Sequence, residues 1–174
     1  MWIFGYGSLM WDPGFAPVEQ VIARLDGWER SFCMTSLHYR GTVAAPGLVL
    51  ALDVMPRAAC TGLALRVEEA QADTVLTCLR ARELVSSAYE ERKVPVTLAD
   101  GRKVRALAYV IDRGHAQYCH HAPEAQARII ARASGLRGHN RDYLFATAAH
   151  LSALGIADPA LDALVQRVRA LTAV

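Results

Sequence analysis

The sequence predicts an α+β domain in which antiparallel strands and helices pack around one core. Three observations lead to this fold class. Strand-like runs of branched and aromatic residues fill the first half, Asp100-Gly101 separates two such runs as a tight hairpin turn does, and apolar residues recur at helical spacing in the last third. Because no repeat, low-complexity tract or linker-like segment divides the chain, residues 1–174 are expected to form a single domain.

Strands are expected at the N-terminus and then in two pairs. The run Trp2-Ile3-Phe4 is typical of a buried strand. Residues 47–54 and 60–67 are apolar runs, and the five residues 55–59 between them are expected to form a short turn. Residues 92–98 and 103–111 flank Asp100-Gly101 and predict a β-hairpin.

Four helices are expected, all of them after residue 67. The first follows Glu68 and Glu69, whose charges suit a helix N-terminus, and its apolar positions continue to Leu79, so that Arg82 and Glu83 lie at or just beyond its end. The other helices are expected to begin at Pro123, at a cap formed by Asn140, and at Asp158-Pro159.

Composition excludes several classes of function. Hydrophobic residues make up 53% of the chain, but no window of about 18 apolar residues is uninterrupted, so no transmembrane helix is expected. The chain opens without a signal-like segment, and cytoplasmic residence is the expectation. Lys and Arg total 19 against 17 Asp and Glu, and the basic residues are scattered, so nucleic acid is not an expected partner.

The cysteines and histidines do not predict a metal centre. Four cysteines occur without a Cys-x-x-Cys pair, and they are expected to be reduced thiols, most of them small core residues. Cys119-His120-His121, with His115 nearby, has the composition of a metal site. Adjacent side chains of an extended segment point to opposite faces, however, so neither a metal nor another cofactor is expected.

The turn after the first strand is the leading candidate for ligand binding. Gly5 and Gly7 flank Tyr6 and leave the backbone little hindered, so that successive N–H groups could form a concave nest for an anion, with the Ser8 hydroxyl as a further donor. The alternative is an ordinary strand end, where Gly and Ser only terminate the sheet. These residues alone favour the ordinary strand end.

The complete string Phe-Gly-Tyr-Gly-Ser-Leu-Met-Trp resembles the N-terminus of the ChaC-type γ-glutamylcyclotransferases, which act on glutathione. Further landmarks follow in the family's order from Trp2 to about Leu171: Arg40-Gly41-Thr42 with Pro46-Gly47, Arg82-Glu83 with Tyr89 downstream, and Asn140-Arg141-Asp142-Tyr143-Leu144-Phe145. After Glu83 the chain reads Leu-Val-Ser-Ser-Ala instead of the Lys-Gly-Gly-Tyr of the animal enzymes, which is more similar to the bacterial branch.

The resemblance implies a fold and a reaction. The fold would be a small closed or nearly closed antiparallel or mixed β-barrel with peripheral helices and a substrate cavity at one mouth. The substrate's own α-amine would attack its γ-carbonyl and release 5-oxoproline and Cys-Gly. By resemblance Glu83 is the catalytic general acid and base, with a pKa that a low-dielectric pocket raises toward neutrality.

Ten residues are candidates for substrate binding, through the backbone of the N-terminal turn, a cation and three tyrosine hydroxyls. Arg40 could bind the glycine carboxylate of glutathione or pair with a structural acid. The candidates are Phe4, Gly5, Tyr6, Gly7, Ser8, Leu9, Arg40, Tyr89, Tyr118 and Tyr143.

Two other functions remain open at this point. The first is the same cyclotransferase chemistry on other γ-glutamyl amides or amino acids. The second is a catalytically silent γ-glutamyl binder, against which the presence of Glu83 argues, because a binder needs no positioned base.

Overall fold

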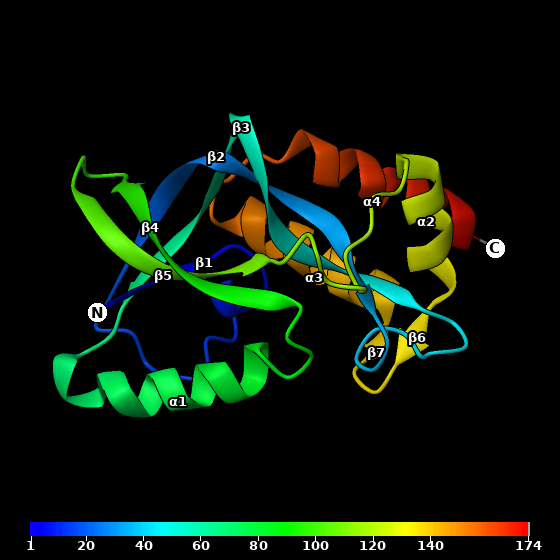
Figure 1. Cartoon of the computed structure of the whole chain (residues 1–174). Helices are drawn as coiled ribbons and strands as arrows, with labels where there is room; N and C mark the ends of the chain where they lie inside the picture. Colours follow the sequence, from blue (N-terminus) through cyan, green and yellow to red (C-terminus); the bar gives the residue numbers. More distant parts are fainter. Residues whose placement is uncertain (174) are drawn as a thin grey trace. The chain divides into compact units, whose positions relative to one another are not determined.

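The computed structural model describes residues 1–173, which form two compact units (Figure 1). The first unit comprises Met1–Ser31 and Ala51–Ala116, and the second comprises Phe32–Leu50 and the chain from Gln117 onward. The chain passes between the units three times, twice inside a strand and once in the segment between Ile111 and Pro123. The elements in order are β1 (Trp2–Gly5), the 3-10 helix η1 (Ser8–Met10), β2 (Glu19–Ser36), β3 (Gly47–Arg66), the 3-10 helix η2 (Glu69–Gln71), α1 (Ala72–Glu83), β4 (Tyr89–Leu98), β5 (Lys103–Ile111), α2 (Pro123–Arg132), β6 (Ser134–Gly135), β7 (Gly138–His139), α3 (Asn140–Ala153) and α4 (Pro159–Thr172).

The strands β1 to β5 form a closed barrel in the order β1-β3-β2-β4-β5, with an additional pairing of β3 with β5. β1 pairs antiparallel with β3 and parallel with β5, so the sheet is mixed. Figure 1 shows α1 beside the strands of the first unit. The expected α+β class and the small barrel with helices outside it are confirmed.

The hairpin of β4 and β5 is confirmed in full. The two strands pair antiparallel from Tyr89 opposite Ile111 to Thr97 opposite Lys103. Gly101 has φ +90°, a backbone conformation that L side chains rarely adopt, so the position after Ala99 and Asp100 in the turn favours glycine.

The separate turn expected at residues 55–59 is wrong, because β3 continues as a strand through these residues, but the expected reversal of chain direction between the two apolar runs is present. The pairings show how the strand accommodates both apolar runs. Leu63 and its successors run antiparallel to β1, whereas Leu52 pairs parallel with Val110 of β5, itself parallel to β1. The strand therefore changes direction between Leu52 and Leu63, in a bend whose residues 54–57 are exposed (Figure 1).

The longest strand missed by the sequence patterns is β2, which has 18 residues. Its alternation is clear only in part: Ala23 and Leu25 are buried, whereas Arg24 and Asp26 are exposed. Gly27 follows with φ +82° and interrupts the alternation inside the strand. A short alternating run broken by a glycine has too little periodicity to predict one long strand.

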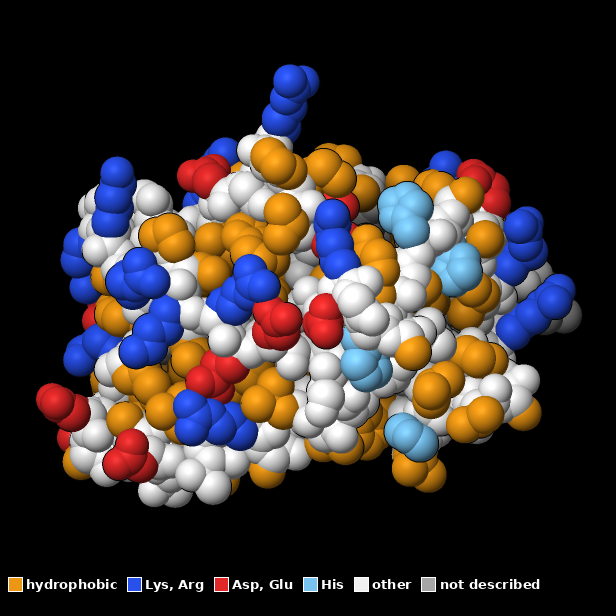
Figure 2. Space-filling model, viewed as in Figure 1, with side chains coloured by type: hydrophobic (Ala, Val, Ile, Leu, Met, Phe, Trp, Pro, Cys, Tyr) orange, Lys and Arg blue, Asp and Glu red, His pale blue; other side chains and the backbone are white. Residues whose placement is uncertain are grey.

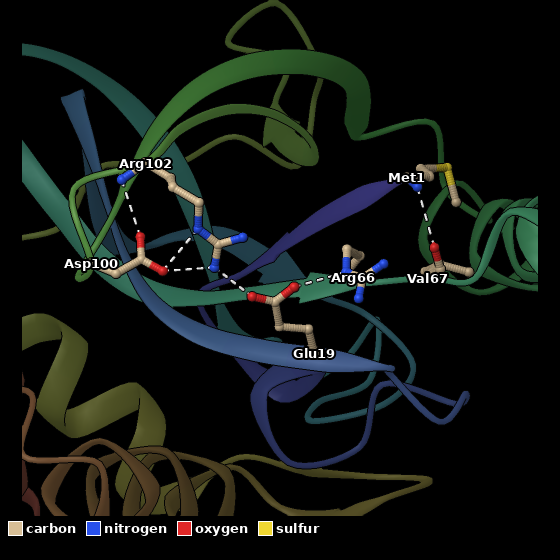
Figure 3. Close-up of polar contacts among 6 residues, drawn as sticks. All are labelled: Met1, Glu19, Arg66, Val67, Asp100 and Arg102. Atoms are coloured by element: carbon tan, nitrogen blue, oxygen red, sulfur yellow. Dashed lines mark hydrogen bonds and ion pairs between the residues drawn. The ribbon is translucent and has the colours of Figure 1, made fainter.

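A cluster of charged residues lies on the outside of the barrel (Figure 3). Arg102 contacts both Glu19 and Asp100, and Arg66 Nε lies 2.8 Å from Glu19 Oε2. All four side chains are substantially solvated, and exposed ion pairs of this kind each contribute about 0–1 kcal/mol. The cluster therefore connects strand ends without dominating stability.

The second unit contains α2, α3 and α4, which pack against one another. Asp158 caps α4 as expected, since its carboxylate accepts from Leu161 N at 3.1 Å. Asn140 is not a cap, and that expectation is wrong. It is the first residue of α3 and is fully buried, and its side-chain amide forms two 2.7 Å hydrogen bonds with the backbone N–H and C=O of Leu48. A buried amide can satisfy both of its groups in this way.

Two glycines of the second unit permit close approach of backbones. A Cβ placed on Gly41 would lie 2.0 Å from Gly47 N, and a Cβ placed on Gly47 would lie 2.1 Å from Arg40 O. Neither position has room for a side chain. The Arg40-Gly41 and Pro46-Gly47 landmarks therefore mark a place where two segments of backbone touch.

No helix within residues 1–173 combines the length and apolar character required to cross a membrane. On the face shown in Figure 2, Lys and Arg side chains are interspersed with Asp, Glu and apolar side chains rather than gathered into one basic surface.

Candidate active site

The turn that follows β1 is a single turn of 3-10 helix, η1, preceded by Gly7. A Cβ on Gly5 would lie 3.3 Å from Leu9 Cβ, so glycine permits the chain to fold back closely here. The first hydrogen bond of the turn joins Met10 N to Gly7 O at 2.9 Å. The N–H groups of Ser8 and Leu9 precede this bond, so η1 itself provides no acceptor for them.

Most side chains beside this turn are buried or form hydrogen bonds within the protein. Phe4 is fully buried, and Leu9 is 6% exposed. The Tyr6 hydroxyl donates to Tyr109 O at 2.8 Å, and Arg30 Nε donates to Tyr6 O at the same distance. These contacts fix the turn against the barrel. The polar groups of the turn that could still bind a ligand are those of its backbone and of Ser8.

Glu83 is the last residue of α1, as the sequence predicts. Its side chain is 16% exposed, and Arg82 Nε lies 3.1 Å from Glu83 Oε1. Leu84 N donates to Arg80 O at 3.0 Å and closes the helix. The carboxylate is thus half-buried at a helix end, beside a guanidinium group.

Arg82 joins the end of α1 to the turn after β1. Its Nη2 donates to Ser8 Oγ at 3.0 Å, and its Nη1 donates to Asp12 O at 2.7 Å. Asp12 Oδ2 lies 3.6 Å from the same Nη1. The structure therefore brings Glu83 and Ser8 together through one arginine, although 74 residues separate Ser8 from Arg82.

A second group of polar side chains in the same unit involves β4 and β5. Glu91 receives hydrogen bonds from Arg80 Nε at 2.8 Å and from Nη2 at 2.7 Å, and these bonds lower the pKa of Glu91. The Tyr109 hydroxyl lies 3.4 Å from Glu91 Oε2. Burial raises the pKa of Tyr109, and the charges of Glu91 and Glu83 raise it further. The phenol is therefore a stable hydrogen-bond donor within electrostatic range of Glu83.

Arg40 and Tyr143 lie together in the second unit. The Arg40 guanidinium lies 5.5 Å from the centre of the Tyr143 ring, and its Nη1 donates to Arg137 O and His139 O. The charge of Asp142 acts on Arg40 and favours its cationic form, so a structural acid remains an alternative partner for Arg40. Burial lowers the pKa of Arg40, which identifies a partly desolvated cation.

The remaining tyrosine candidates lie in different units. Tyr89 begins β4 in the first unit and pairs with Ile111. Tyr118, in the second unit, forms an isolated antiparallel bridge with Met34. Tyr143 also contacts Phe32 edge to face, with ring centres 6.0 Å apart.

The four cysteines are all free thiols: Cys33 and Cys60 are buried, Cys78 is exposed and Cys119 is intermediate. Burial raises the pKa of the Cys119 thiol, which disfavours the reactive thiolate. In the described part of the chain, no three His, Cys, Asp or Glu side chains are arranged to hold a metal ion.

Comparison with known proteins decides the family. The profile of the ChaC-like proteins matches residues 1–171. The chain belongs to the ChaC-like family. Its relatives include the glutathione-specific gamma-glutamylcyclotransferase of Escherichia coli (strain K12), 38% identical over 174 residues, with 99% of this chain and 74% of that protein covered. The human glutathione-specific gamma-glutamylcyclotransferase 1 is 35% identical over 159 residues, with 89% and 71% covered.

A yeast γ-glutamyl cyclotransferase specific to glutathione has the same fold. Its crystal structure superimposes with a TM-score of 0.90 at 22% identity and covers 98% of this chain and 96% of that one. At this identity the likeness concerns the fold alone. The ChaC-like protein therefore has the barrel that its sequence landmarks predict.

Two residues of this ChaC-like protein enter the site without a role assigned from the sequence. Arg82 is visible only as the residue before Glu83, and nothing local identifies Ser8 as its partner. Tyr109 lies in the apolar run of β5, where an aromatic residue is typical of the core. A polar neighbour across the strand pair, Glu91 opposite Tyr109, could have drawn attention to it.

Proposed function

We propose that this protein is a glutathione-specific γ-glutamylcyclotransferase that releases 5-oxoproline and Cys-Gly. Family membership and the names of its relatives support the reaction and the substrate. We further propose that it acts in the cytoplasm and needs no metal or other cofactor, because the nucleophile belongs to the substrate.

The reaction balances with one carboxylate. Glu83 takes a proton from the substrate's α-ammonium, and the resulting amine attacks the γ-carbonyl carbon to close a five-membered ring. The γ-amide C–N bond then breaks, and the protonated Glu83 returns its proton to the leaving nitrogen. The ring nitrogen loses its second proton as it becomes the lactam N–H, and the released amine takes up this proton to become an ammonium group. Ring closure needs the γ-glutamyl chain to be bent, and orientation of this kind contributes up to about 7–11 kcal/mol in intramolecular reactions.

The observation that carries the proposal is the contact of one arginine with both Glu83 and Ser8. Arg82 lies 3.1 Å from Glu83 Oε1 and 3.0 Å from Ser8 Oγ, so the acid/base group and the N-terminal turn share one contact. The backbone from Gly5 to Leu9 would bind the α-carboxylate of the γ-glutamyl group or the developing oxyanion.

The other candidates keep the roles that were expected from the sequence. Arg40 would bind the glycine carboxylate of glutathione, since it is a partly desolvated cation. Tyr89, Tyr118 and Tyr143 would donate hydrogen bonds to the substrate. The Tyr109 phenol is a further candidate donor near Glu83.

The decisive experiment incubates the purified protein with glutathione and, separately, with γ-glutamyl amino acids, and measures 5-oxoproline. Release from glutathione together with stoichiometric Cys-Gly is expected. Release only from γ-glutamyl amino acids would identify the alternative cyclotransferase. Saturable glutathione binding without 5-oxoproline would identify a catalytically silent binder.

A further inference from the structure

We propose that Arg82 is a positioning residue that holds the Glu83 carboxylate in a fixed position relative to the turn after β1. The inference rests on the proposed function, because it assigns Glu83 the proton transfers. Arg82 itself is not assigned contact with the substrate. Its effect on the reaction is exerted through Glu83.

The contacts of Arg82 use all three guanidinium nitrogens. Nε contacts Glu83 Oε1 at 3.1 Å, Nη2 contacts Ser8 Oγ at 3.0 Å, and Nη1 contacts Asp12 O at 2.7 Å. The guanidinium group is rigid and planar, so these three distances cannot vary independently. The Arg82 side chain is only 22% exposed, which reduces competition from water.

The position of Glu83 makes such a restraint necessary. It is the final residue of α1, and no further helical turn follows to hold its backbone. An active-site group displaced by about 1 Å can cost roughly 10²-fold in rate. Arg82 connects the carboxylate at this helix end to the turn after β1, which lies outside the helix.

A nearby arginine on the same helix shows that this arrangement is specific. Arg80 also lies in the last turn of α1, but its guanidinium group forms both of its hydrogen bonds with Glu91 of β4. A cation is expected near any helix C-terminus because of the helix dipole. That general effect does not explain why Arg82 contacts the turn after β1.

The test compares Arg82→Gln with the wild-type protein, in the presence and absence of Glu83→Gln. With Glu83 intact, Arg82→Gln is expected to lower kcat for glutathione about 10- to 100-fold, with a change in KM below about threefold. In the Glu83→Gln background, the same substitution is expected to lower the residual kcat less than about threefold, because no proton-transferring carboxylate remains to be positioned.

Two further variants complete the test. Arg82→Lys retains the charge but cannot contact three partners, so its kcat is expected to lie between those of the wild type and Arg82→Gln. Arg24→Gln is the matched control, because it removes an exposed arginine whose ion pair with Asp26 lies outside the site. Its kcat and KM are expected to equal those of the wild type.

Three outcomes would overturn the inference. They are wild-type kcat in a folded Arg82→Gln protein, an equal loss in both Glu83 backgrounds, or a loss that parallels the unfolded fraction in thermal melts. If Arg82→Gln does not fold, Arg82→Lys decides, and wild-type kcat in that variant would refute positioning. A wild-type protein that is inactive on glutathione would instead refute the proposed function, and the inference with it.

Discussion

Glu83→Gln should separate chemistry from folding, because it removes a proton-transferring group and preserves the shape of the side chain. A positioned acid/base group contributes about 10²- to 10⁴-fold to the rate. At about 1.4 kcal/mol per tenfold change, this is about 3–6 kcal/mol of transition-state stabilisation. We therefore expect kcat for glutathione to fall at least about 10²-fold.

The contacts of Glu83 predict a much smaller effect on stability. The carboxylate has a 3.1 Å ion pair with Arg82, and the two side chains are 16% and 22% exposed. A partly solvated pair contributes about 0–1 kcal/mol to stability, and the glutamine oxygen can still accept from Arg82 Nε. For a protein of this size, 1 kcal/mol corresponds to about 2–4 °C in Tm, so Tm should fall by no more than about 4 °C.

The assay measures 5-oxoproline under saturating glutathione, and thermal melts are recorded on the same preparations. Glu90→Gln is the matched control, since it makes the same chemical change in an exposed ion pair with Arg92. A cooperatively folded Glu83→Gln protein with more than about a tenth of the wild-type kcat would remove Glu83 from the reaction. A fall in Tm above about 10 °C would instead indicate a structural role.

Three further outcomes are expected. Activity should persist after chelation and after alkylation of the exposed Cys78 thiol, and inactivation by a chelator that one added metal reverses would contradict the proposed chemistry. Gly7→Val should raise KM for glutathione while Tm stays close to that of the wild type. Gly7 has a negative φ of −137°, so the substitution tests whether the turn has space for a side chain. A destabilised variant with wild-type KM would exclude the turn as the binding loop. Because Arg80 lowers the pKa of Glu91 from 4.5, this pair should stabilise the fold above that pH and lose its effect as pH falls further, so the free energy of unfolding should decrease less on acidification in Arg80→Gln than in the wild type. Urea titrations of both proteins between about pH 5 and pH 3 would measure the difference, and identical pH dependences would contradict it.

Local sequence was sufficient for elements whose pattern is complete within a few residues. The β4–β5 hairpin follows from Asp100-Gly101 between two apolar runs, and α4 follows from Asp158-Pro159 and its apolar positions. It was insufficient where the backbone departs from regular periodicity. β2 contains Gly27 with positive φ, and β3 bends without leaving the strand conformation, so neither could be predicted from periodicity alone.

Parts of the candidate site could also be identified from the sequence, whereas other parts could not. Glu83 at the end of α1 and the turn from Gly5 to Leu9 were identified from the sequence and its family resemblance. The hydrogen bonds of Arg82 with Ser8 and of Tyr6 with Tyr109 were not, because they join residues 74 and 103 positions apart. No local pattern encodes such partners.

The sequence by itself thus determined the fold class, the helix that ends at Glu83 and the glycine-containing turn after β1. Propensity, capping and periodicity act over a few residues, and they are sufficient to define these features. Only the tertiary structure decided that Arg82 contacts both Glu83 and Ser8, and that Arg40 is partly desolvated. Periodicity determines which face of a strand or helix is buried, whereas the partner of a polar group depends on which distant segments the closed barrel and the packed helices bring beside it.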